Sequence, residues 1–253
     1  MRRQENRRIG QYSHLLALLS LAAAILYPFG VRAEETFEVK AKPPVVIELF
    51  TSQGCSSCPA ADKFFEQLAG QENVIALSCH VSYWNLGSWT DTLSQDFCDI
   101  RQHGLASLDN PPKIYTPQMI MNGMNPFIGS RPDDIKSAIS AARNQEVQPI
   151  AITRNEKILR YELPEAAIKT PKGFRLWMYG YKKSVSEDIK AGENGGLKVH
   201  YVNAAVTYDN LGPWEGDPIT SAAIVPQEDV DGVVIFAQAG GYGRIVAAGK
   251  IEF

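Results

Sequence analysis

The feature that most constrains this chain is a Cys-X-X-Cys segment between a predicted strand and a predicted helix. A short apolar run at residues 45–50 is typical of a buried strand, and residues 51–54 read as a turn. A helical pattern with one apolar face covers residues 57–69. Cys55 and Cys58 lie between the two. The segment therefore predicts two cysteines at the start of a helix that follows a buried strand.

Two cysteines at this spacing can close a disulfide reversibly. The free N–H groups and the positive dipole end of a helix favour a thiolate, so we expect the pKa of Cys55 to fall below the free value of roughly 8.5. A lower pKa makes that sulfur both more available as a thiolate and a better leaving group. This chemistry predicts Cys55 as the attacking cysteine and Cys58 as the resolving one.

Pro117 opens a strand predicted at residues 118–121 and is the second informative feature. In thioredoxin-type folds, a cis-proline at the start of that strand faces the cysteine pair. A cis bond would place the Thr116 backbone against the sulfurs and leave it free to pair with an extended substrate. A trans proline at the first residue of a strand is the alternative. Given the cysteine pair, we predict the cis form.

The remaining pattern divides the chain into two halves. Up to residue 145, strand and helix patterns alternate, with strands at 73–83, 118–121 and 127–128 and helices at 90–108 and 132–144. From residue 146, β-rich runs recur between turn residues at 147–153, 158–163, 174–182, 197–208, 219–225, 232–239 and 244–253. The patterns predict an α/β layer fold over 34–145, followed by an all-β sandwich-like domain over 146–253.

Residues 1–33 have the features of a signal peptide: a basic start, an apolar run and a small-residue end at Ala33. The apolar run of about 12 residues is shorter than the roughly 20 that a membrane span needs, although an uncleaved anchor is the alternative. Cleavage removes five arginines and one glutamate, so the net charge changes from −3 to −7. This charge argues against nucleic-acid binding. We expect a periplasmic or secreted protein that is not membrane-bound after cleavage.

Residues 46–63, VIELFTSQGCSSCPAADK, resemble the hallmark of a domain-of-unknown-function family of secreted bacterial thioredoxin-like proteins. Other matching segments are HV at 80–81, YW at 83–84, YTPQ at 115–118, NG at 122–123 and GENGG at 192–196. The resemblance implies a thioredoxin-like domain followed by a β-rich domain, and it implies little about the substrate. The family's usual aspartate before Tyr83 is Ser82 here, so no role that needs an acid there is carried over.

Glu48 interrupts the first predicted strand, seven residues before Cys55. In thioredoxin-like folds, a buried acid near this place takes the proton from the second cysteine, and burial raises its pKa toward neutrality. We therefore consider Glu48 as a proton acceptor. The other interpretation is an acid on the solvent face of the strand or paired with a nearby lysine.

Cys79 and Cys98 lie in the second predicted strand and the following helical segment. A structural disulfide between them is the favoured interpretation, closing a loop of about 20 residues and contributing roughly 3 kcal/mol by chain entropy. An electron relay from Cys55–Cys58 and metal ligation are the alternatives. His80 and His103 lie nearby, but the spacing lacks a second Cys-X-X-Cys or a His-X3-His, so we predict no metal site.

The sequence favours a thiol–disulfide oxidoreductase that needs no organic cofactor and acts on protein thiols or disulfides. The catalytic candidates are Cys55, Cys58, Pro117, Thr116 and Glu48. One alternative is a non-catalytic binding or structural module with a static disulfide. The other is a copper-handling protein with Cys55, Cys58 and His80 as ligands. The aromatic residues Tyr83, Trp84 and Trp89 either line the site or belong to the core.

Overall fold

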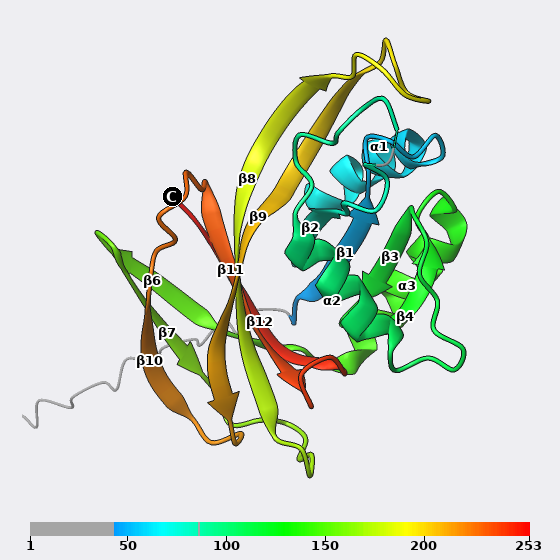
Figure 1. Ribbon diagram of the computed structural model, residues 1–253. Helices are drawn as coiled ribbons and strands as arrows, with labels where there is room; N and C mark the ends of the chain where they lie inside the picture. The colour runs from blue at the N-terminus through cyan, green and yellow to red at the C-terminus, as the bar shows by residue number, and fades with distance from the viewer. Residues whose placement is uncertain (1–42, 86) are drawn as a thin grey trace, which may run out of the picture. The chain divides into compact units, whose positions relative to one another are not determined.

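Strand β1 (Val45–Thr51), predicted at residues 45–50, is buried along its whole length. The computed structural model describes residues 43–85 and 87–253 (Figure 1), so the predicted signal peptide lies outside the described residues. The helices are α1 (Cys58–Ala69), α2 (Asp96–Ala106), α3 (Pro132–Ala142) and the short 3-10 helix η1 (Arg143–Gln145). The other strands are β2 (Val74–His80), β3 (Gln118–Met121), β4 (Met124–Ile128), β5 (Gln148–Pro149), β6 (Ala151–Asn155), β7 (Ile158–Leu163), β8 (Phe174–Asp188), β9 (Lys198–Trp214), β10 (Ile219–Ile224), β11 (Gly232–Ala239) and β12 (Ile245–Glu252).

Helix α1 and the β3–β4 hairpin form where the sequence predicts them. Helix α1 has a proline in its first turn, where the missing N–H costs nothing. Strands β3 and β4 form a hairpin around Asn122 and Gly123, whose φ angles of 48° and 71° lie in the left-handed region that a tight hairpin turn requires. These parts of the sequence are locally consistent with the structure that they adopt.

Nine of the strands form one mixed sheet, in the order β4-β3-β1-β2-β9-β8-β11-β12-β5. Strands β1 and β2 are parallel, while β8, β9, β11 and β12 are joined by antiparallel pairs. The N-terminal and C-terminal parts of the sheet meet where Ser78 of β2 pairs with Ala204 of β9. The Asn203 side chain reinforces this junction by donating a hydrogen bond to the carbonyl of Ala76 at 3.0 Å.

The predicted architecture, an α/β thioredoxin-like domain followed by a separate all-β sandwich, is therefore wrong. Five strands of the second half (β5, β8, β9, β11 and β12) extend the sheet of the first half, and only β6, β7 and β10 form a separate three-stranded sheet. An unpaired edge of β2 would leave backbone N–H and C=O groups without hydrogen-bond partners. The long strand β9 pairs with this edge, and this pairing joins the two halves into one sheet. The predicted boundary at residue 146 falls between η1 and β5.

Side chains alternate across β1 and β2, so the two faces of this part of the sheet bury different groups. One face, here called the α1 face, packs Ile47 and Leu49 against Phe65 of helix α1. The opposite face, here called the α2 face, packs Phe50 with Cys98 of helix α2. Figure 1 shows the two helices on either side of these strands. Both faces are covered, which explains the nearly continuous apolar run in β1.

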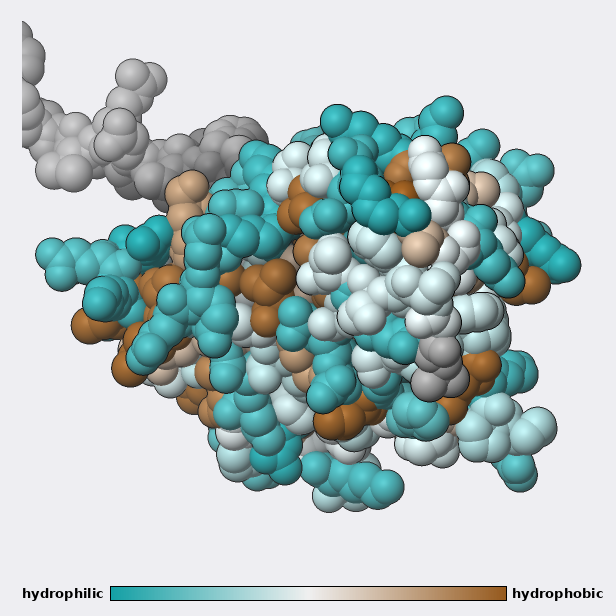
Figure 2. Space-filling model, turned by 45° about the horizontal axis from the view of Figure 1, so that its top comes forward, coloured by the Kyte–Doolittle hydropathy of each residue, from teal (hydrophilic) through white to brown (hydrophobic). Residues whose placement is uncertain are grey.

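The surface is mixed in character. On the face shown in Figure 2, strongly apolar residues form separate patches among polar ones. Among the described residues, no helix is both long enough and apolar enough to cross a membrane.

Candidate functional site around the Cys55–Cys58 disulfide

Cys55 and Cys58 form a disulfide at the start of α1, with their Cα atoms 5.4 Å apart. The predicted pair is therefore confirmed as a disulfide. The Cys58 N–H donates to the Cys55 carbonyl at 3.1 Å, and the Cys55 Sγ lies 3.4 Å from the Ser57 hydroxyl. Only 1% of Cys55 and 0% of Cys58 is exposed. The sulfurs thus lie at a helix N-terminus, but under a cover of neighbouring residues.

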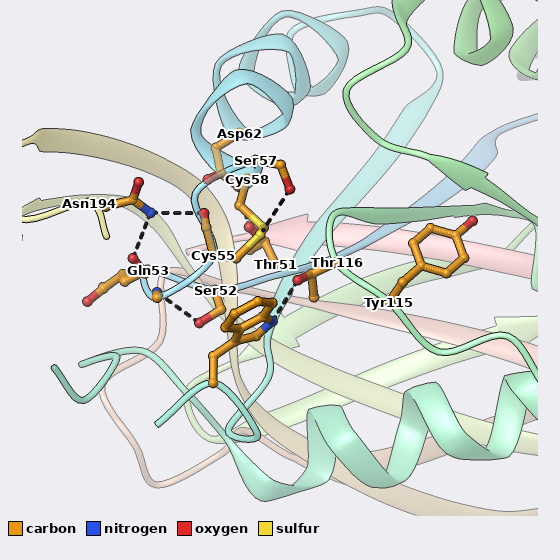
Figure 3. The surroundings of a disulfide bond; sticks show 12 residues. Thr51, Ser52, Gln53, Cys55, Ser57, Cys58, Asp62, Tyr115, Thr116 and Asn194 are labelled. Atoms are coloured by element: carbon orange, nitrogen blue, oxygen red, sulfur yellow. Dashed lines mark hydrogen bonds between the residues drawn. A yellow bond between two sulfur atoms is a disulfide. The ribbon is translucent and has the colours of Figure 1, made fainter. Parts of the chain in front are cut away.

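Thr116 and Pro117 are brought to the same place. The peptide bond between them is cis, as predicted. Figure 3 shows Thr116 beside the cysteine pair, where its hydroxyl accepts a hydrogen bond from Trp84 Nε1 at 2.7 Å. Gly129 lies between Pro117 and Ala61 of α1, because a Cβ on Gly129 would come within 3.3 Å of both. The cis-proline segment therefore adjoins the helix start that carries the cysteines.

Glu48 is not brought to the cysteine pair. Its side chain points to the α2 face, where both carboxylate oxygens accept hydrogen bonds from Arg101, at 2.9 and 2.8 Å. Tyr179 donates a third hydrogen bond at 3.2 Å. The predicted role as proton acceptor for Cys58 fails on geometry, because Glu48 and α1 lie on opposite faces of the sheet. The alternative interpretation, a solvent-facing acid or a lysine pair, also fails, because Glu48 is buried and pairs with an arginine.

Asp62 is the acid that the structure does place on the α1 face. It lies one helical turn after Cys58, is 4% exposed and accepts a hydrogen bond from the Thr51 hydroxyl at 2.8 Å. Its second oxygen, Oδ2, is buried without a hydrogen-bond partner among the described residues. Burial raises the pKa of Asp62 from 3.8 to about 7, although His80 and the Thr51 hydroxyl act in the opposite direction. Asp62 is therefore a buried acid that can change protonation state near neutral pH.

His80 and Asp91 form a second buried polar pair on the same face. His80 Nδ1 and Asp91 Oδ2 are 2.8 Å apart, and the His80 ring meets Tyr201 edge-on at 4.6 Å. Burial acts to raise the pKa of Asp91, but His80 and the N–H groups of Gln53 and Leu93 hold that pKa below its usual value. A carboxylate thus stands next to the imidazole.

Cys79 and Cys98 form the second disulfide, which confirms the predicted pairing. Both residues belong to the core of the α2 face, whereas Cys58 begins the helix on the other face. Within residues 43–85 and 87–253, no three His, Cys, Asp or Glu side chains are grouped in a way that could hold a metal ion. His80, the proposed copper ligand, is hydrogen-bonded to Asp91.

The aromatic residues after β2 line a groove next to the disulfide. The groove has a volume of about 540 Å³ and is lined by Gly54, Tyr83, Trp84, Gly87, Ser88, Trp89, Gly192 and Glu193. Trp214 lies elsewhere, packed against Phe174 in the core beside the three-stranded sheet. Tyr83, Trp84 and Trp89 therefore border the site, whereas Trp214 is structural.

Two residues of the site escaped the sequence reasoning. Asp62 follows Cys58 by four residues, a spacing that places both on one side of a helix, so helical periodicity could have identified it. Asn194 contacts the cysteine-bearing turn from about 140 positions away, and its hydrogen bonds to Gln53 and Cys55 have no local sequence signal. Its only trace in the sequence is the family-like GENGG segment.

Comparisons with known proteins place the chain in a family without assigning an activity. A crystal structure of protein AGR_C_4864 from Agrobacterium tumefaciens is 26% identical, with a TM-score of 0.71 over 82% of this chain and 93% of that chain. HBP35 of Porphyromonas gingivalis shares the fold, with a TM-score of 0.59 at 17% identity over 84% of this chain and 76% of that one. No curated protein matches the sequence. Residues 46–238 match the family described as "Protein of unknown function (DUF1223)", and the chain therefore belongs to the DUF1223 family.

Proposed function

We propose that the protein is a thiol–disulfide oxidoreductase that acts through Cys55 and Cys58. The observation that carries this proposal is the buried Asp62, one turn after Cys58. One of its carboxylate oxygens has no hydrogen-bond partner in the part of the chain that the structure describes, and burial raises its pKa to about 7. A static disulfide has no use for a proton acceptor, whereas exchange needs one when the resolving thiol attacks. The α1 N-terminus supports the other requirement, because its free N–H groups favour a thiolate at Cys55.

The proposed exchange has two steps and transfers two electrons. In the reduced protein, the Cys55 thiolate attacks a disulfide of a partner protein and forms a mixed disulfide, and one partner sulfur leaves as a thiolate. Asp62 then accepts the proton of the Cys58 thiol, and the resulting thiolate attacks the Cys55 sulfur. This step closes the Cys55–Cys58 disulfide and releases the second partner sulfur as a thiolate. The partner is reduced by two electrons, and the reverse sequence oxidises it; the chemistry needs no organic cofactor.

The cellular setting that we propose is extracytoplasmic. The two disulfides are typical of an oxidising compartment, and the predicted signal peptide at residues 1–33 supports export to the periplasm or beyond. Protein thiols or disulfides in that compartment are the proposed partners.

The test is the capture of a mixed disulfide. A Cys58→Ser variant keeps the attacking Cys55 but cannot resolve the intermediate, so we expect it to accumulate reductant-sensitive adducts with a reduced-and-reoxidised disulfide protein such as scrambled ribonuclease. The matched control is the Cys55→Ser/Cys58→Ser double variant, which retains Cys79–Cys98. Adducts that form equally in the control, or in neither protein, would contradict the proposal.

A second candidate, a static disulfide in a binding or structural module, is favoured by one observation: both sulfurs are buried. A structural disulfide of this kind has a reduction potential below about −300 mV and resists exchange with thiol buffers. The two candidates therefore differ in whether the cover over the sulfurs opens.

A further inference from the structure

The tip of the β8–β9 hairpin, residues 189–197, is a tight loop that reaches the cysteine-bearing turn. Ile189 is buried and fixes the base of the tip, where its N–H and carbonyl pair with Leu197 and Gly196 at 2.9 and 2.8 Å. Gly192 and Gly196 have φ angles of 78° and 88°, a region that favours glycine. The tip is therefore a preorganised turn and not an extended flap.

Asn194 is the residue of this tip that holds the turn. Its amide nitrogen donates two hydrogen bonds, to the carbonyl of Gln53 at 2.8 Å and to the carbonyl of Cys55 at 2.9 Å (Figure 3). Asn194 is 4% exposed, although its neighbours Glu193 and Gly195 are exposed. Both protons of one buried amide thus bind the backbone on either side of Gly54.

Trp84 covers the same turn from another side. Its Cβ and carbonyl oxygen lie so close to Gly54 that a Cβ on that glycine would come within 3.2 and 3.3 Å of them. Its indole Nε1 reaches across to the Thr116 hydroxyl at 2.7 Å. The hairpin tip and Trp84 thus both contact the turn that carries the buried Cys55, and they are here called its cover. Attack on a disulfide needs access to one sulfur, so this cover must open before exchange.

We propose that Asn194 is the gating residue of the Cys55–Cys58 disulfide: its two hydrogen bonds hold the cover closed, and their release exposes the Cys55 sulfur. The biological meaning of this gate rests on the proposed oxidoreductase function, but access to the sulfur is measurable without it. Asn194 acts as a positioning residue, since it contacts the backbone of the turn and not the sulfurs. Gly192 and Glu193 of the same tip also line the neighbouring groove, so a partner seated there contacts the gate directly.

The experiment measures the rate at which dithiothreitol reduces each disulfide. One dithiothreitol sulfur attacks the protein disulfide, and its second thiol then closes a cyclic disulfide. Dithiothreitol thereby gives two electrons to the protein, whose two cysteines are released as thiols. Alkylation at successive times and peptide mass spectrometry give separate rates for Cys55–Cys58 and for Cys79–Cys98. The second disulfide is an internal reference, because it is equally buried but on the α2 face.

We expect Asn194→Ala to accelerate reduction of Cys55–Cys58 by at least roughly tenfold, which corresponds to about 1.4 kcal/mol, and to leave the Cys79–Cys98 rate unchanged. Asn203→Ala is the matched control. It removes a buried amide bond to the Ala76 carbonyl, but it does not touch the cysteine-bearing turn. The proposal that Asn194 is the gating residue would be overturned if Asn194→Ala accelerated the reduction of both disulfides equally. It would also be overturned if Asn203→Ala accelerated the reduction of Cys55–Cys58 as much as Asn194→Ala does.

A measurement on the unaltered protein keeps the proposal testable if the variant fails to fold. Opening of a local cover exposes little surface, so we expect the Cys55–Cys58 reduction rate to be nearly independent of urea below the unfolding transition. A rate that rises with urea as steeply as global unfolding does would overturn the gate. Mixed-disulfide capture distinguishes the two proposals: capture without an Asn194 effect overturns only the gate, and an Asn194 effect without capture overturns only the oxidoreductase function.

Discussion

The two faces of the β1–β2 part of the sheet each bury a carboxylate near a disulfide, but the two carboxylates differ in whether an arginine pairs with them. On the α2 face, Cys98 lies three residues before Arg101, which binds both oxygens of Glu48. On the α1 face, Cys58 lies four residues before Asp62, whose second oxygen lacks a partner among the described residues. Each face thus has a helix, a disulfide and a buried acid next to that helix, but Glu48 is paired with an arginine, whereas Asp62 forms no ion pair with an arginine or lysine of the described residues.

This difference shows how burial alone does not decide the role of an acid. The Glu48 carboxylate joins β1 to α2 through two hydrogen bonds from Arg101, and loss of one partner would leave the other buried and unpaired, so the α2 face is built for stability. A buried acid without a cation partner is costly to ionise, and its pKa moves toward neutrality. The α1 face is therefore the one on which proton transfer is chemically available, beside the disulfide at a helix start.

The largest expected effect comes from breaking the ion pair of the α2 face. Arg101→Met leaves the Glu48 carboxylate buried without its partner, so we expect the free energy of unfolding to fall by about 3–5 kcal/mol. Urea unfolding followed by circular dichroism measures it. Arg131→Met is the control, because the exposed pair of Arg131 with Asp134 should contribute less than about 1 kcal/mol. Equal effects of the two substitutions would remove the structural role given to the α2 face.

The pH dependence of stability tests the α1 face. Asp62 titrates at about 7 in the folded protein and at 3.8 when unperturbed. The stability linked to its neutral form is therefore fully present below about pH 4 and lost as the pH rises through about 7. The loss is on the order of 4 kcal/mol at most, since each pKa unit corresponds to about 1.4 kcal/mol.

The side chain introduced by Asp62→Asn does not titrate. We therefore expect the decrease in the free energy of unfolding between about pH 4 and pH 8 to lose the part that is linked to Asp62, as measured by urea unfolding. The exposed Asp133→Asn is the control and should keep the slope of the unaltered protein. The same variant should also slow resolution of the mixed disulfide around neutral pH. An unchanged stability slope in Asp62→Asn would contradict the raised pKa.

Removal of the second disulfide sharpens the contrast between the two pairs. Cys79→Ala/Cys98→Ala opens a loop with a sequence separation of 19, so we expect a loss of about 3 kcal/mol in the free energy of unfolding. Mixed-disulfide formation through Cys55 should be retained when it is assayed well below the unfolding transition. Loss of that activity in a folded variant would show that the two disulfides act together, which is the relay alternative.

The smallest expected effect concerns the cover of the α1 face. Trp84→Phe keeps an aromatic ring but removes the indole N–H that donates to Thr116. Loss of this hydrogen bond should lower the free energy of unfolding by about 1 kcal/mol or less. Trp214→Phe removes a similar indole hydrogen bond, to the Asp217 carbonyl, in a remote core. We expect only the first substitution to accelerate reduction of Cys55–Cys58 by dithiothreitol. Equal reduction rates in the two variants would exclude Trp84 from the cover.

Local chemistry made much of the N-terminal half predictable. The strand at 118–121 and the helix that begins at 132 have the predicted starts, and the cysteine pair lies where the strand, turn and helix signals placed it. The strand and helix starts depend on residues close together in the chain. The cis form of the Thr116–Pro117 bond is also confirmed, although that prediction relied on the distant cysteine pair.

The errors arose where distant segments meet. Strand β8 extends to Asp188, beyond the predicted run at 174–182, whereas β9 begins at Lys198, close to the predicted start at 197. Exposed polar residues in the outer part of β8 concealed the strand that carries the hairpin tip to the site. Glu48 was misassigned because its partner, Arg101, is on a helix with a weak apolar face. No local pattern could have linked the two.

A redox titration of both disulfides in one sample shows directly whether the two differ in function. The protein is equilibrated with dithiothreitol and glutathione buffers that span a range of potentials, and thiols are trapped and quantified for each pair by mass spectrometry. We predict that Cys55–Cys58 is half-reduced well above about −300 mV and that Cys79–Cys98 is still oxidised there. Reduction of both pairs only below about −300 mV would contradict the account and leave Cys55–Cys58 as a static disulfide.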